Sequence, residues 1–371
     1  TTGDLCTAVG AYALQTNVTG QGNTAVGNNA LEDNTGHSNT AVGNRASYDN
    51  TSGRDNVAIG NNALAANTTT NYSTAVGSFA LYNNTTANNT GVGYQALYTN
   101  TSGSEVSALG SYALSLNTTG NYNAAFGFAA LGSNTTASGN TGLGWRALGA
   151  NTTGGGGTSV GYNSLRSNTT GANNTACGNG ALYSNTDAAN NTAVGFEALL
   201  SNTTGAQNTA LGKSAGSSHI DGAQNLILGW NAQTASTGSA NSVTLGGTYV
   251  TDLRCADTSI SSLSDRRDKT DIIDLPVGLD FIKTIRPVKF KWQTRDKTES
   301  KDGTIRAGFI AQELQEAQKD CDYLNLVMDD NPDKLEAKQG KLIPVLVQAI
   351  KELSAKNDAL AAEVEQLKSQ L

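Results

Sequence analysis

The stretch NTAVGNNALEDNTG, residues 23–36, decides the fold of this chain, because close copies of it follow one another as far as about residue 250. The glycine after the valine marks each copy. These marker glycines are Gly10, Gly27, Gly43, Gly60, Gly77, Gly93, Gly110, Gly127, Gly144, Gly161, Gly178, Gly195, Gly212, Gly229 and Gly246. The fifteen marks lie 16 or 17 residues apart. So regular a period is typical of a solenoid or fibre, in which each repeat buries its apolar side only by stacking on its neighbours.

Each repeat is too short for a helical hairpin, and Gly, Asn and Thr are poor helix formers. Short runs such as residues 24–26 and 40–42, set between Gly and Asn, favour short strands and tight turns. We therefore predict a mainly β repeat solenoid, a trimeric β-roll or β-helix shaft, over residues 1–250. Because stacked strands rise about 4.8 Å per coil, fifteen coils would make a rod about 70 Å long.

The expected interior of one coil is thin: in the second copy it consists of Ala25, Val26, Ala30 and Leu31. This is little apolar burial against the entropy of ordering a whole repeat. Two features would compensate. An Asn recurs seven positions after most marker glycines, and stacked Asn amides can hydrogen-bond from coil to coil. Several chains can also associate around a shared axis, which protects exposed strand edges.

Charge is concentrated in the last third of the chain. Residues 1–250 hold 14 of the 55 charged side chains, and residues 251–371 hold the other 41. The net charge of −7 gives no reason to expect a nucleic-acid partner. The four cysteines have no pairing or metal-ligand spacing, and His37 and His219 both lie in repeat loops, so we expect no metal and no cofactor. No membrane span is visible in the sequence.

Four segments are predicted: the solenoid over residues 1–250, a junction over 251–263, a small α+β domain over 264–340 and a coiled coil over 341–371. The coiled coil rests on a heptad pattern, since leucines recur every seven residues at d positions and apolar residues with one Asn fill the a positions. We expect its trimer core to be formed by Leu346, Ile350, Leu353, Asn357, Leu360, Val364 and Leu367. The heptad by itself does not select three chains.

Three segments after residue 263 are specific in combination. They are SDRRDK at residues 264–269, the run over 278–292 that contains RPVKFKW, and GFIAQE at 308–313. Together, over about residues 259–357, they resemble the endosialidase-type intramolecular chaperone domain found at the C-terminus of phage tail spikes and fibres. The resemblance implies a trimerisation chaperone that cuts itself off, and it is what favours three chains.

Carried over by position, the resemblance makes Ser264 and Lys269 a catalytic dyad and Leu263–Ser264 the scissile bond. A serine hydroxyl is a poor nucleophile until a neighbour takes its proton. A lysine can do so only when it is neutral, so its pKa must fall about three units from its usual value of about 10.4. Burial on trimer assembly would lower this pKa.

Nearby charges also bear on the predicted dyad. Asp265, Arg266 and Arg267 are possible supporting residues, and the two arginines are candidates for lowering the lysine pKa. Asp268 stands where the family often has an apolar residue. An acid beside Lys269 could raise its pKa and slow cleavage.

The array and the resemblance together predict a homotrimeric phage tail fibre or spike that attaches to a host receptor or glycan. The shaft would remain in the virion. The chaperone fragment would be released after assembly in the host cytoplasm. Because the chain opens inside a repeat, we expect a preceding part that joins other tail proteins. Whether the shaft binds a ligand or is only a spacer stays open.

Several alternatives remain. The first is a bacterial trimeric surface adhesin with the same chaperone, and the array does loosely resemble the β-roll heads of trimeric autotransporter adhesins. The second is a non-viral membrane-associated factor. A glycan-cleaving shaft would need paired carboxylates, and the array has only nine scattered Asp or Glu. A regular row of threonines along the array would suit ice binding. Val57, Ser107, Ala124 and Leu226 interrupt that row, which argues against this function.

Overall fold

The computed structural model describes residues 4–247, 250, 264–293, 300–329, 331, 333 and 335–370. The chain divides into two compact units, Thr1–Asp252 and Leu253–Leu371. The predicted junction, residues 251–263, lies outside the described residues, and with it the predicted scissile residue Leu263.

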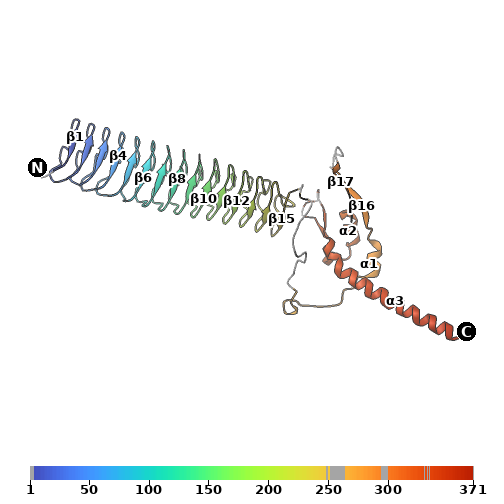
Figure 1. The fold of residues 1–371 in the computed structure, drawn as a ribbon. Helices are drawn as coiled ribbons and strands as arrows, with labels where there is room; N and C mark the ends of the chain where they lie inside the picture. Colours follow the sequence, from blue (N-terminus) through green and yellow to red (C-terminus); the bar gives the residue numbers. More distant parts are fainter. Residues whose placement is uncertain are drawn as a thin grey trace. The chain divides into compact units, whose positions relative to one another are not determined.

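The first unit is a parallel β-solenoid, in which three-residue strands stack in chain order into one 15-stranded sheet (Figure 1). The strands are β1 (Thr7–Val9), β2 (Thr24–Val26), β3 (Thr40–Val42), β4 (Val57–Ile59), β5 (Thr74–Val76), β6 (Thr90–Val92), β7 (Ser107–Leu109), β8 (Ala124–Phe126), β9 (Thr141–Leu143), β10 (Thr158–Val160), β11 (Thr175–Cys177), β12 (Thr192–Val194), β13 (Thr209–Leu211), β14 (Leu226–Leu228) and β15 (Val243–Leu245). Each strand pairs in register with the next, so equivalent residues of successive repeats lie side by side. The predicted solenoid is confirmed.

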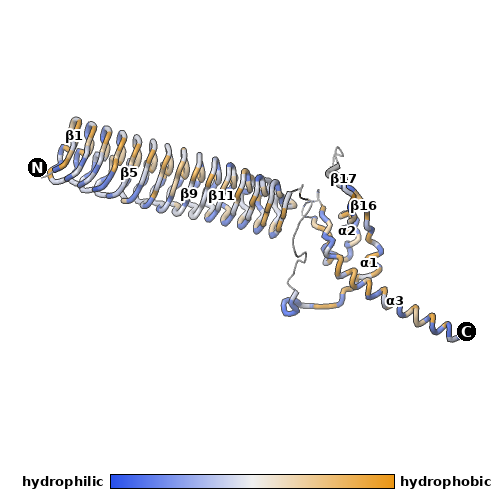
Figure 2. The backbone as a smooth tube through the Cα atoms, in the orientation of Figure 1, coloured by the Kyte–Doolittle hydropathy of each residue, from blue (hydrophilic) through white to orange (hydrophobic). Residues whose placement is uncertain are grey.

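Alanine and leucine build the interior of the solenoid. The middle residue of a strand, such as Ala25, and the leucine four residues after the marker glycine, such as Leu31, are fully buried. The third strand residue faces outward: Val26 is only half-buried, and Leu143 is 48% exposed. The expectation that Val26 belongs to the interior is therefore wrong. Successive strand side chains point to opposite faces, so Thr and Val share the outer face while Ala takes the inner one. Figure 2 shows the hydropathy pattern repeating from coil to coil.

The marker glycine ends each strand where neighbouring coils lie closest. At Gly144 φ is +135°, and a Cβ there would lie 2.4 Å from the carbonyl oxygen of Gly161. The following turn holds the buried leucine in the left-handed region as well, with φ of 52° at Leu148. This conformation is unfavourable for leucine. It is held because Leu148 N donates to Ser164 O at 3.1 Å in the next coil while the side chain is buried.

The predicted Asn ladder is confirmed. Asn117 Nδ2 donates to Asn100 Oδ1 at 2.8 Å, and Asn134 Nδ2 donates to Asn117 Oδ1 at 2.8 Å. Each amide also closes its own turn, as Asn117 Nδ2 does on the carbonyl of Gly120 at 3.0 Å. These side chains are fully buried, so the ladder is a polar part of the core rather than a surface feature.

A second Asn ladder, which the sequence analysis missed, precedes the strands. Asn39 Oδ1 accepts from the backbone N of Asn56 at 3.1 Å, and Asn39 Nδ2 donates to Gly53 O at 2.8 Å. The same amide donates to Asn34 Oδ1 at 3.2 Å and so joins the two ladders. The signal was available, since the best-formed copies begin Asn-Thr-Ala-Val-Gly.

His219 takes the place of a ladder Asn, seven residues after Gly212. It is fully buried, with Nε2 2.8 Å from Gly222 O and Nδ1 3.2 Å from Thr234 Oγ1. We expected His219 to be a loop residue, but the structure places it in the polar core of the coil. Its Nε2 reaches the carbonyl three residues on, as the amide of a ladder Asn does, whereas Asn202 Oδ1 in the preceding coil has no hydrogen-bond partner among the described residues.

The second unit is a small α+β region (Figure 1). Its elements are η1 (Arg266–Asp268), α1 (Leu279–Thr284), β16 (Val288–Gln293), β17 (Ser300–Gly308), α2 (Ala311–Ala317), η2 (Asp322–Leu324), β18 (Val327–Met328), β19 (Glu336–Ala337), η3 (Gln339–Leu342) and α3 (Ile343–Gln370). The run over residues 278–292 supplies α1 and most of β16, with Pro287 between them. Leu314, Leu326 and Val345 lie at the centre of its core.

Helix α3 has two apolar sides. Val345 and Ala349 are buried against the rest of the unit, whereas the predicted trimer-core stripe is open, with Ile350 66% and Leu360 58% exposed. One chain therefore leaves the heptad face uncovered within its described part. Among the described helices none is both long and apolar enough to cross a membrane.

Candidate functional site

A single 3₁₀ turn, η1, brings Ser264 and Lys269 together. Asp265 caps it, because its Oδ1 accepts from Arg267 N at 2.9 Å. Asp268 N then donates to Asp265 O at 3.2 Å, and Lys269 N donates to Arg266 O at 3.2 Å. The turn reverses the chain direction, so a side chain at position 269 can reach back to position 264.

The two predicted catalytic side chains are in direct contact. Lys269 Nζ donates to Ser264 Oγ at 2.6 Å. Both residues are exposed in the single chain. The two side chains are therefore close enough for proton transfer between them. Such chemistry also needs water to be excluded, and the described residues of one chain do not cover the pair.

The predicted supporting residues behave differently from one another. Arg267 forms a salt bridge with Asp265, with Nη2 2.6 Å from Oδ2, and this pairing holds the pKa of the Asp265 carboxyl below its ordinary value. The same contact raises the pKa of Arg267. Arg267 is thus occupied with the cap of the turn. Arg266 is exposed.

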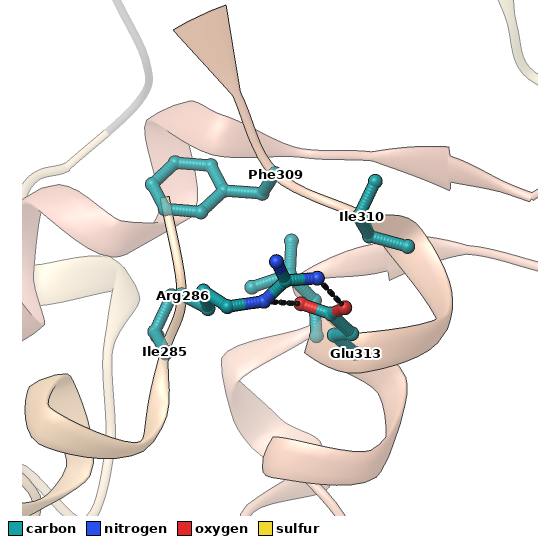
Figure 3. Close-up of a pocket in the computed structure, with 6 residues that line it drawn as sticks. Ile285, Arg286, Phe309, Ile310 and Glu313 are labelled. Atoms are coloured by element: carbon teal, nitrogen blue, oxygen red, sulfur yellow. Dashed lines mark hydrogen bonds and ion pairs between the residues drawn. The ribbon is translucent and has the colours of Figure 1, made fainter. Parts of the chain in front are cut away.

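The later two segments of the resemblance meet in an ion pair that the sequence analysis did not identify. Arg286, just before β16, and Glu313, in α2, form a two-pronged contact in which Nε donates to Oε2 at 3.2 Å and Nη2 to Oε1 (Figure 3). Glu313 raises the pKa of Arg286. The sequence shows that Arg286 and Glu313 carry opposite charges in two separate segments. Their spacing along the chain does not show that the two side chains touch.

The crevice around this ion pair is too small for a substrate. It is lined also by Ile285, Phe309 and Ile310, and its volume is about 10 Å³, the space of a single water at most (Figure 3). Arg286 and Glu313 therefore tie α2 to the start of β16 rather than bind a ligand. The described residues contain no cluster of three or more His, Cys, Asp or Glu that could hold a metal ion.

Comparison with known proteins gives one match. Residues 264–323 match the Peptidase S74 family model, described as chaperone of endosialidase. The match begins at Ser264 and contains all three segments quoted from the sequence. The chain thus carries an intramolecular chaperone domain, and this family implies, in general, a self-cleaving peptidase domain. No curated protein and no solved structure matches the chain.

Proposed function

We propose that this chain is the distal part of a homotrimeric phage tail fibre or spike. Its solenoid stays in the virion and attaches to the host, and residues 264–371 trimerise the chains and then remove themselves by cleavage before Ser264. The observation that carries the proposal is the 2.6 Å contact between Lys269 Nζ and Ser264 Oγ at the first residue of the chaperone match, in a chain whose first unit is a repeat shaft.

The proposed reaction begins with neutral Lys269 taking the proton of the Ser264 hydroxyl. Ser264 Oγ attacks the carbonyl carbon of Leu263, the carbon–nitrogen bond breaks, and the proton passes to the departing Ser264 nitrogen. The product is an ester between Leu263 and Ser264 Oγ. Water then hydrolyses the ester, which leaves a carboxylate on Leu263 and restores the serine hydroxyl.

Assembly is the proposed switch for this reaction. In the single chain Lys269 Nζ donates to Ser264 Oγ and both side chains are exposed, so the dyad is open to water. Burial between three chains disfavours the charged form and lowers a lysine pKa. Cleavage therefore follows correct trimerisation, and removal of the chaperone leaves the shaft kinetically trapped.

Two uncovered apolar surfaces support association of the chains. One is the heptad stripe of α3. The other is the outer strand face, where the third strand residue is exposed in coil after coil, for instance Ile59 at 39%, Leu109 at 48% and Leu211 at 52%. A coiled coil forms locally and quickly, whereas a long parallel rod can misregister, so a C-terminal clamp aligns the chains first.

The proposal is tested with the full chain and its Ser264→Ala and Lys269→Met variants, analysed by denaturing gel, N-terminal sequencing and analytical ultracentrifugation. Wild type should give a trimer and a fragment that begins at Ser264. Both variants should give an uncleaved trimer. Cleavage in Ser264→Ala would refute the dyad, and a monomeric wild type would refute the trimer.

A further inference from the structure

Aromatic rings line one face of the solenoid in six successive coils. We call this row the aromatic ladder; it consists of Phe79, Tyr94, Tyr112, Phe128, Trp145 and Tyr162. Consecutive rings are 4.9–6.5 Å apart between centroids, and the last three are stacked. The ladder follows from the fold: its members lie one or two residues after a marker glycine, and the in-register sheet places such positions above one another.

The ladder is open to solvent. Tyr94 is 41%, Phe128 41%, Trp145 37% and Tyr162 51% exposed. The equivalent position holds Asn28, Asn44, Asn61 or Asn179 in other coils, so the fold itself does not need rings there. A contiguous row of exposed aromatic rings is typical of a binding surface.

A groove continues the same face beyond Tyr162. Its volume is about 410 Å³, and its lining includes Asn163, Gly180, Tyr183 and Glu197. Gly180 stands where coils of the ladder carry Phe79 or Tyr112, so the missing side chain opens the groove. The lining combines one more ring with amide and carboxylate groups. The side-chain oxygen of Asn163, buried beside the groove, has no hydrogen-bond partner among the described residues.

The chemistry of this face favours an uncharged carbohydrate. Between residues 74 and 163 the only charged side chains are Glu105 and Arg146, and the guanidinium of Arg146 lies over the Trp145 ring, 4.7 Å from its centroid. Sugar rings present flat C–H faces that pack on aromatic rings, and hydroxyls that bond to amides and carboxylates. Because the rings recur once per coil, successive sugar units of a polysaccharide can pack on successive rings.

A second copy of the chain fits this face less well. Contact around a shared axis would follow the whole shaft, as the outer strand face does, whereas the unbroken row of rings spans six coils and only the isolated rings of Phe196 and Trp230 follow it at the same position. We propose that the aromatic ladder and the groove from Asn163 to Glu197 form one binding tract for a neutral polysaccharide. This deepens the proposed function, since it places the host-binding surface on the side of the shaft.

The test uses the purified full chain on an array of bacterial polysaccharides, neutral and anionic. Trp145→Asn and Tyr162→Asn introduce the residue that other coils already carry at that position, so folding should be kept. Tyr122→Asn is the matched control: Tyr122 is 63% exposed but lies twelve residues after its marker glycine, outside the ladder. We expect each ladder variant to lose neutral-polysaccharide binding roughly tenfold and the control to retain it.

Oligomeric state and cleavage are measured on the same samples. The inference is overturned if no neutral polysaccharide is retained, if only anionic ones bind, if ladder variants bind as wild type does, or if Trp145→Asn dissociates the trimer. A chain that binds through the ladder but neither trimerises nor cleaves would refute the proposed fibre and leave the binding tract standing.

Discussion

Replacement of Asn84 by alanine tests how much the buried Asn ladder contributes to the shaft. Asn84 is fully buried, and its Nδ2 donates to Thr86 O at 2.6 Å. Its Oδ1 accepts from Asn89 Nδ2 and from Asn100 Nδ2, each at 2.9 Å. Alanine removes all three hydrogen bonds. At about 1 kcal/mol net for each, the local free energy of unfolding should fall by about 3 kcal/mol.

Hydrogen exchange is the suitable assay, because a repeat array opens locally and a single melting temperature would average over many coils. A loss of about 3 kcal/mol should accelerate exchange of the β5 and β6 amides roughly 100-fold, with distant coils unaffected.

Asn83→Ala is the neighbouring control. The Asn83 side chain is half-buried and makes no hydrogen bond to a described residue, while its backbone N keeps its 3.2 Å bond to Tyr98 O. If Asn84→Ala and Asn83→Ala exchange within a factor of three of each other, the ladder does not stabilise the rod and the reasoning is refuted.

Two further predictions follow from single contacts. Gly144→Ala should destabilise its coils by at least about 2 kcal/mol, because φ is +135° and the new Cβ would lie 2.4 Å from the next coil. Gly132→Ala should be mild, since Ala65 fills the same position in another coil. Equal hydrogen-exchange rates in the two variants around the substituted coil would contradict this. Glu352 accepts from Leu279 N at 2.7 Å, which lowers its pKa from 4.5, so its stabilisation of the α1–α3 packing is present above pH 4.5 and lost as pH falls below it. In Glu352→Gln the acid dependence of unfolding, followed by circular dichroism, should be flatter than in wild type, and an unchanged curve would exclude this role.

The candidate site was predictable only in part. The resemblance predicts Ser264 and Lys269 as a dyad, and the structure brings their side chains into contact. The sequence could not show that Arg267 forms a salt bridge with Asp265, because this contact depends on the direction in which the 3₁₀ turn orients the Arg267 side chain. The contact between Arg286 and Glu313 was likewise hidden, since it requires α2 to pack beside the start of β16.

For the shaft, the sequence by itself determined the period, the position of the marker glycines and the Asn ladder, because a strict repeat forces equivalent residues to stack. Only the tertiary structure decided that Val26 faces outward and that Leu148 takes a left-handed backbone. Neither is a local preference of the residue. Both follow from the neighbouring coil, which supplies the hydrogen-bond partners and the buried space that make an otherwise unfavourable conformation the stable one.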